Sequence, residues 1–160
     1  MRALPSDNQH WSVLEQLPIR DKVFFVETII KEHPLALSAA DFPLAHHFLP
    51  GMYLRDVHVR KGMLTIGKIH KHPCANFLIK GDRSTVVGDR IVRVKAPYMD
   101  ISPAGTKRIT YTHEDSVWRT AHLTTETDIE KLEHDLVAET EQEYEEFCRM
   151  VEAETHKCLS

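Results

Sequence analysis

Between residues 52 and 124 the chain runs through short segments rich in β-branched and aromatic residues, each followed by a turn signal. The turn signals combine Gly, Pro and Asp, as in Lys61-Gly62, Gly81-Asp82 and Pro103-Ala104-Gly105. Many short strands joined by tight turns are typical of an antiparallel sandwich or barrel. No helix-sized segment interrupts them, which argues against a βαβ layout. The predicted strands cover residues 53–59, 63–72, 76–80, 84–87, 90–94, 98–101, 108–112 and 117–124.

A helical pattern precedes this region. Val23, Val26 and Ile30 fall on one face of a predicted helix over residues 19–32, and prolines stand before and after it. We assign residues 1–40 to an N-terminal helical arm. A proline-punctuated loop then leads into the β region.

A second helical pattern follows the β region. Thr127 and Glu130 have the spacing of a capping box. We expect one continuous helix over residues 127–155, with an apolar stripe on a charged surface. The stripe packs on its own barrel or pairs with a second copy in a homodimer. Its members are Ile129, Leu132, Leu136, Thr140, Tyr144, Phe147 and Val151.

These three regions form one structural domain: the helical arm, a β-barrel over residues 41–125, and an acidic amphipathic helix over residues 126–160. A chain of 160 residues is long enough to bury a core of its own.

The net charge of −4 is unevenly distributed. From Glu126 onward there are 12 acidic and 3 basic residues, whereas the first 125 residues carry 17 basic and 12 acidic ones. The basic residues of the body are scattered rather than clustered, so we expect no nucleic-acid partner. A partly basic pocket for a small anionic molecule suits this pattern better.

The cysteines predict a reducing compartment. Cys74, Cys148 and Cys158 form neither an even-numbered set nor a Cys-x-x-Cys pair. No run of about 18 apolar residues is present, and the N-terminus lacks the apolar core of a secretory signal. We therefore expect a cytoplasmic protein with no membrane partner.

The densest chemical signal is the pair His70 and His72. Side chains two apart on a strand point to the same face, so both rings would converge if that face is the interior. Imidazole is a common ligand for zinc, iron, copper and nickel. Spacing alone favours the alternative of two surface histidines or two hydrogen-bonded core histidines.

The pattern Gly…His-x-His…Gly followed by Pro-x-Gly resembles the two-part signature of the cupin superfamily. The first part matches Gly62 or Gly67, His70-Lys-His72 and Gly81, and the second matches Pro103-Ala-Gly105. The resemblance covers about half of the chain, residues 52–124. Stretches 67–72, 95–97, 102–108 and 126–133 most resemble small single-domain cupins of phages and bacteria, which would imply a host cytoplasm if phage-encoded.

The resemblance implies a mainly β protein with a jelly-roll-like barrel, a metal or small ligand inside, and frequent homodimerisation. This sequence departs from the pattern at two ligand positions. Asn76 stands where metal-binding cupins have Glu, and Arg108 stands where they have His. Only His70 and His72 carry over as metal ligands, while Asn76 offers a weaker carbonyl oxygen.

His122 is our candidate for the third ligand. It lies on the predicted strand beside residues 108–112, on the same face as Trp118. His70, His72 and His122 would bind Zn(II), Fe(II), Ni(II) or Mn(II) with open positions for water or substrate. The alternative is a His122 that is hydrogen-bonded in the core. His113 lies in a turn and is predicted to be exposed.

Arg108 supports a different site. With Lys68 and Lys107 it would make an anion pocket that clamps a carboxylate or phosphate. The predicted ligand-binding residues are Lys68, Asn76, Arg108, Tyr111 and Trp118. Cys74, close to the histidine pair, is a soft ligand or a small buried residue.

Two functions follow from these residues. The first is a metal-dependent cupin enzyme acting on a small anionic molecule. The second is a non-catalytic protein that binds or sequesters an anion or a nucleotide, and a scaffold without a ligand is a third alternative.

Overall fold

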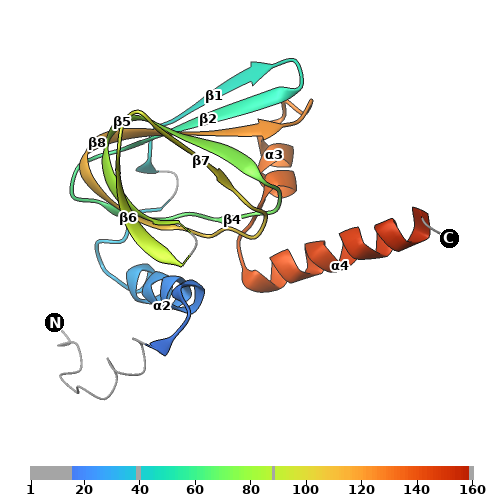
Figure 1. Ribbon diagram of the computed structural model, residues 1–160, viewed down its shortest axis with the longest axis horizontal. Helices are drawn as coiled ribbons and strands as arrows, with labels where there is room; N and C mark the ends of the chain where they lie inside the picture. The colour runs from blue at the N-terminus through green and yellow to red at the C-terminus, as the bar shows by residue number, and fades with distance from the viewer. Residues whose placement is uncertain (1–15, 39–40, 88, 159–160) are drawn as a thin grey trace.

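The computed structural model describes residues 16–38, 41–87 and 89–158, and side chains as far as residue 155. Residues 1–15 of the predicted N-terminal arm lie outside the described part of the chain. The described chain is dominated by antiparallel strands, with helices at both ends (Figure 1). The predicted fold class, mainly β with a jelly-roll-like arrangement, is confirmed. The strand pairings of the described residues do not close the sheet into a barrel.

The main sheet has seven strands and the backbone order β1-β2-β8-β5-β6, with β3 paired to β8 and β7 paired to β5. A second sheet pairs the two short strands β4 and β9. Every pairing is antiparallel. The strands are β1 Leu44–Leu49, β2 Met52–Val59, β3 Leu64–Ile66, β4 Ile69–His70, β5 Cys74–Val87, β6 Arg90–Lys95, β7 Tyr98–Ser102, β8 Ile109–Leu123 and β9 Val137–Ala138.

The paired long strands β5 and β8 form the centre of the sheet. The sequence predicts four strands where the structure has these two, because Gly81-Asp82 and Glu114-Asp115 lie in an irregular part of the ladder rather than in turns. The register shifts between Leu78 and Arg83. Gly81 has φ +99, and a Cβ there would lie 2.6 Å from the Cβ of Ser116. Only glycine fits this close approach without displacing the partner strand.

Because of the irregularity, the two halves of β5 pair with different strands. Residues Cys74 to Leu78 pair with β7, and residues Asp82 to Val87 pair with β6, while β8 accompanies both halves. The strand therefore passes from one part of the sheet to another, as jelly-roll topologies require. The prediction of a loop before residue 52 is corrected. Part of this segment is strand β1, which pairs along its whole length with β2.

The predicted N-terminal helix is confirmed as α2, Ile19–Lys31, which begins after Pro18. Val23 on its inner face is fully buried. Two ion pairs attach the helix to the rest of the chain: Arg20 with Glu141, and Glu27 with the buried Lys107. The Arg20 guanidinium also donates to the carbonyl of Gly105.

The prediction of one continuous C-terminal helix is corrected. The structure has α3, Ile129–Leu136, and α4, Glu141–Cys158, with β9 between them. Val137 and Ala138 are buried and pair with His70 and Ile69 of β4, so tertiary pairing overrides the helical spacing. Asp128, one residue after the predicted position, caps α3 by accepting from the Lys131 N–H.

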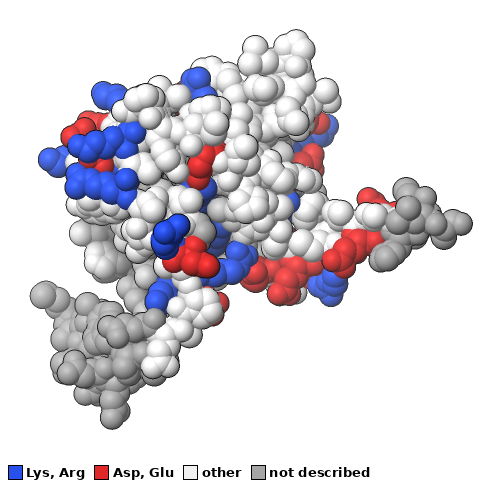
Figure 2. Space-filling view, viewed as in Figure 1, with Lys and Arg blue, Asp and Glu red and all other residues white. Residues whose placement is uncertain are grey.

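The predicted apolar stripe is divided in the same way. Leu132 and Leu136 of α3 are buried in a cluster with Tyr53 and Val137. On α4, Val151 is 44% exposed. The far half of α4 projects from the sheets, and acidic side chains gather along this helix (Figures 1 and 2). Homodimerisation stays a prediction.

Among the helices that the structure describes, none has the length and apolar character needed to cross a membrane.

The two halves of the stripe predict different effects on stability. Leu136→Glu places a carboxylate among buried apolar side chains and should lower the free energy of unfolding by about 3 kcal/mol. The matched change Val151→Glu lies on an exposed surface and should change it by less than about 0.5 kcal/mol. Chemical denaturation of both variants measures this difference. Equal losses in the two variants would contradict the assigned packing.

Candidate metal centre

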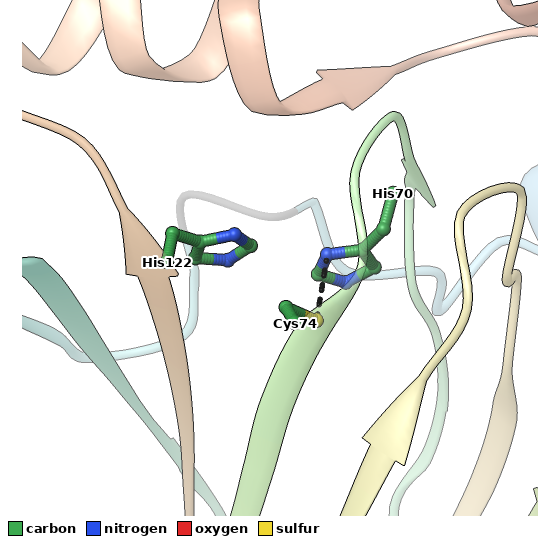
Figure 3. A group of neighbouring side chains, drawn as sticks. All are labelled: His70, Cys74 and His122. Atoms are coloured by element: carbon green, nitrogen blue, oxygen red, sulfur yellow. Dashed lines mark hydrogen bonds between the residues drawn. The ribbon is translucent and has the colours of Figure 1, made fainter.

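Three potential metal ligands from different strands meet at one end of the sheet. They are His70 of β4, Cys74 at the start of β5 and His122 near the end of β8 (Figure 3). One ligand atom from each lies within 4.8 Å of those of the other two. Cys74 and His122 are buried, and His70 is half-buried. Groups with this donor set and spacing can hold a transition metal.

Backbone pairing places each of the three side chains. β5 and β8 pair Ala75 with Ala121, so Cys74 and His122 flank the same rung of the ladder. Two backbone hydrogen bonds hold His70 in place. Its N–H donates to the carbonyl of Thr106, and its carbonyl accepts from the N–H of Gly105. The Pro103-Ala-Gly105 motif of the sequence therefore supports His70 through the backbone.

The rings of His70 and His122 are almost parallel, with centroids 5.5 Å apart and an interplanar angle of 8°. The Sγ atom of Cys74 lies 3.5 Å from Nδ1 of His70. The Nδ1 atom of His122 is buried and has no hydrogen-bond partner among the residues that the structure describes. A buried imidazole nitrogen normally finds a partner, so this atom indicates a site with a missing one.

Burial keeps both histidines neutral. It lowers the pKa of His70 to about 3, and the neighbouring His122, Arg55 and Arg108 act in the same direction. Burial, with Arg55, lowers the pKa of His122 to about 4. Neutral imidazole is the form that binds metals. Burial also raises the pKa of the Cys74 thiol, so a metal would have to displace its proton.

The structure does not bring His72 into this group. Its side chain is exposed, and its ring meets the edge of the Phe147 ring of α4 at 5.2 Å. β4 ends at His70 and β5 begins at Cys74, so the chain bends at His72 and same-face alternation does not hold there. The neighbouring Lys71 is buried; its Nζ lies over the same Phe147 ring and donates to the carbonyl of His134.

Cys74 takes the place that the sequence assigned to His72. The signal in the sequence is the spacing His70-x-x-x-Cys74 across Pro73, which returns the chain toward the histidine. Cys74 has a second contact, 3.9 Å from its Sγ to Oδ1 of Asn76.

The positions of Asn76 and Arg108 correct the predicted anion clamp. Nη2 of Arg108 donates to Asp100 at 2.6 Å and to Ser102 at 2.7 Å, and Nδ2 of Asn76 donates to the same Ser102 hydroxyl. Asp100 therefore balances the guanidinium charge inside the protein. Nη2 of Arg108 and Nδ2 of Asn76 therefore have partners inside the protein, whereas Nη1 of Arg108 is buried without one among the described residues.

Lys68 and Arg55 form a charged cluster beside His122. Both pair with Glu133 of α3, and Lys68 also pairs with Glu139. A small space next to His122 is lined by Arg55 and Glu133, and by Tyr53 and the apolar residues of α3 and β9. The helix α3 thus covers the histidine end of the sheet.

The remaining predicted residues lie elsewhere. Tyr111 is exposed and packs against His113, and Lys107 pairs with Glu27. His113 is half-buried, with Nε2 2.7 Å from the Ser84 hydroxyl, so the prediction of an exposed side chain is corrected. Trp118 lies under the guanidinium of Arg83.

A larger cleft of about 630 Å³ lies at another position, between residues 115–117 of β8 and the segment before β1. His58, Arg60 and Lys80 line it, and none of the three potential metal ligands does.

No protein-family model and no curated protein matches this sequence. Three solved structures are similar in fold. KdgF from Halomonas sp. is 15% identical, with 62% of this chain and 93% of that chain covered and a TM-score of 0.48. A cupin-2 domain protein from Shewanella frigidimarina is 11% identical, with 68% and 95% covered and a TM-score of 0.42. An acetylacetone dioxygenase from Acinetobacter johnsonii is 15% identical, with 57% and 74% covered and a TM-score of 0.43.

The second of these proteins is named for the cupin domain that the motifs of this sequence resemble. At such identities and TM-scores, the similarities carry no information about activity or ligand.

The lowered pKa values of His70 and His122 predict that the free energy of unfolding falls as the pH is lowered. Below pH about 6.5 both imidazoles bind protons in the unfolded chain, whereas in the folded chain they stay neutral down to about pH 4. Between these limits the metal-free protein should lose about 3 kcal/mol per histidine. Urea denaturation at several pH values in this range measures how steeply the free energy of unfolding falls with pH, and His122→Gln should make this slope smaller. The control His58→Gln changes an exposed histidine of β2 and should leave the slope intact. A His122→Gln protein with the wild-type slope would contradict the neutral, buried state.

Proposed function

We propose that this protein binds one divalent transition-metal ion through His70, Cys74 and His122, inside a cupin-like jelly roll. The observation that carries the proposal is the convergence of three soft or borderline donors from three strands. One of the three residues, His122, has a buried Nδ1 atom without a hydrogen-bond partner in the described chain. Two imidazoles and a thiolate favour Zn(II), with Fe(II) and Ni(II) as alternatives, over the oxygen-preferring Mn(II).

The surrounding charges are compatible with a cation. Arg55 and Arg108 both act on His70, but each is paired with a carboxylate, Glu133 and Asp100 respectively. The positive charge of the guanidinium groups is therefore largely compensated before an ion enters.

A metal with three protein ligands keeps a fourth position for water or a substrate, where it supplies Lewis-acid chemistry. Arg55 and Tyr53 lie beside His122, but the gap that they line is too small for a water molecule, so a substrate would have to displace part of this lining. A half-buried guanidinium there would orient a small anionic molecule, at the cost of its pairing with Glu133. We propose such a molecule as the substrate class.

The position of α3 favours a second candidate function, non-catalytic metal binding. Leu132, Leu136 and Val137 are buried and line the space beside His122. A centre closed in this way by apolar side chains would retain its metal and exclude larger substrates. Small anions that change the spectrum of a bound metal would favour the enzyme, and an unchanged spectrum would favour the binder.

The test uses cobalt(II) and zinc(II) added to metal-free protein. The wild type should bind one equivalent of cobalt and show the charge-transfer absorption of a thiolate ligand, which Cys74→Ser should abolish. His70→Ala and His122→Ala should each lower zinc affinity by about tenfold or more, because two ligands hold the ion weakly.

His72→Ala is the matched control, since His72 belongs to the same sequence motif but lies outside the group. It should bind cobalt like the wild type. Loss of metal in His72→Ala, together with an intact thiolate band in Cys74→Ser, would reject the proposed ligand set.

A further inference from the structure

Arg83 is an arginine in the interior of the protein, on the second half of β5. Its residue exposure is 5%. The shift of register around Gly81 directs Asp82 toward Arg93 of β6 and leaves Arg83 opposite Thr112 of β8. Directly opposed residues of an antiparallel pair have their Cβ atoms about 5 Å apart, so Thr112 lies next to Arg83.

The guanidinium of Arg83 has few partners. Nη2 lies 3.5 Å from the hydroxyl of Thr65, a long contact, and the group stacks over the ring of Trp118 at 5.3 Å. Nε is buried without a hydrogen-bond partner in the described chain. Within residues 16–38, 41–87 and 89–158, no carboxylate pairs with it.

Other arginines of the protein differ in this respect. Five described arginines form ion pairs with carboxylates although all are less buried than Arg83: Arg20 with Glu141, Arg55 with Glu133, Arg93 with Asp82, Arg108 with Asp100 and Arg119 with Asp56. The described arginines for which no ion pair is seen, Arg60, Arg90 and Arg149, are exposed to solvent. Burial without a counter-charge is unfavourable for a guanidinium.

Loss of the proton does not relieve this unfavourable burial of charge. Burial lowers the pKa of Arg83 only to about 10, so the group stays charged at neutral pH. Stacking on Trp118 stabilises the cation but leaves its N–H donors unused. The hydroxyl of Thr112, the residue directly opposite Arg83, is also buried without a partner in the part of the chain described.

We propose that Arg83, with Thr112 and Trp118, forms a second site that binds the carboxylate or phosphate group of a small molecule in the interior. The guanidinium supplies the charge and the paired donors that match an oxyanion. The Thr112 hydroxyl supplies a further donor, and the Trp118 ring supports the plane of the guanidinium.

The evidence for an anion site at Arg83 does not depend on the proposed metal centre. Only the relation between the two sites rests on the proposed function. Trp118 and His122 are four residues apart on one face of β8, which corresponds to about 13 Å along a strand. An elongated molecule anchored by its anionic end at Arg83 would point its other end toward the metal centre. This geometry assigns the substrate class to small carboxylates or phosphate esters.

The test follows the fluorescence of Trp118 in full-length, chelator-treated protein carrying Trp11→Phe, which leaves Trp118 as the one tryptophan. Inorganic phosphate and acetate are titrated separately at constant ionic strength, and the melting temperature is recorded in parallel. A saturable change with either anion, accompanied by a higher melting temperature, is expected. A response to phosphate alone assigns a phosphate ester, and a response to acetate alone assigns a carboxylate.

Arg83→Met replaces the guanidinium by an apolar side chain of similar length. It should weaken the anion response by about tenfold or more, and its melting temperature without anions should equal or exceed that of the parent, because an uncompensated buried charge has been removed. Arg90→Met, at an exposed arginine of β6, is the matched control and should respond like the parent.

Two results would overturn the proposal: a full response retained in Arg83→Met, or no change in fluorescence and melting temperature with either anion. Zinc binding by Arg83→Met separates this site from the metal centre. It should equal that of the parent whether or not the anion site exists.

Discussion

The antiparallel pairing of β5 with β8 is the interaction on which the rest of the structure depends. Both strands continue through an irregularity at Gly81, where a side chain would collide with Ser116. Before the irregularity, the ladder brings Cys74 close to His122. Beyond it, the same ladder places Arg83 inside the protein. One long, bent pair of strands therefore organises both the proposed metal centre and the proposed anion site.

Charge compensation distinguishes these two sites. Around the histidines, carboxylates from α3 and β7 balance the guanidinium groups, which leaves neutral donors and room for a cation's charge. Around Arg83 the described chain offers hydroxyls and an aromatic ring, so the positive charge is uncompensated. The acidic C-terminal segment takes part in this balance, because Glu133, Glu139 and Glu143 pair with Lys68, Lys71 and Arg55 of the more basic body.

Local patterns in the sequence predict where most strand residues lie, the N-terminal helix and the inward direction of His122, because alternation and proline signals act over a few residues. They do not predict β1, or that β5 and β8 each run through a predicted turn. The same reasoning fails at His72, where the chain bends after a two-residue strand and alternation no longer applies. It also fails at Val137, where pairing with β4 interrupts a helical repeat. The sequence offers Cys74 as a soft ligand or as a small buried residue, and only the pairing of β5 with β8 favours the first alternative by bringing it to His122. Arg83 is recognisable as a site residue only when strands distant in sequence are brought together.

The most direct test of this account is X-ray absorption at the zinc edge of protein loaded with one equivalent of zinc. The account predicts one sulfur neighbour at about 2.3 Å and nitrogen neighbours at about 2.0 Å, with the sulfur contribution lost in Cys74→Ser and the spectrum unchanged in His72→Ala. A first shell of nitrogen and oxygen alone, or a sulfur contribution that survives Cys74→Ser, would contradict it.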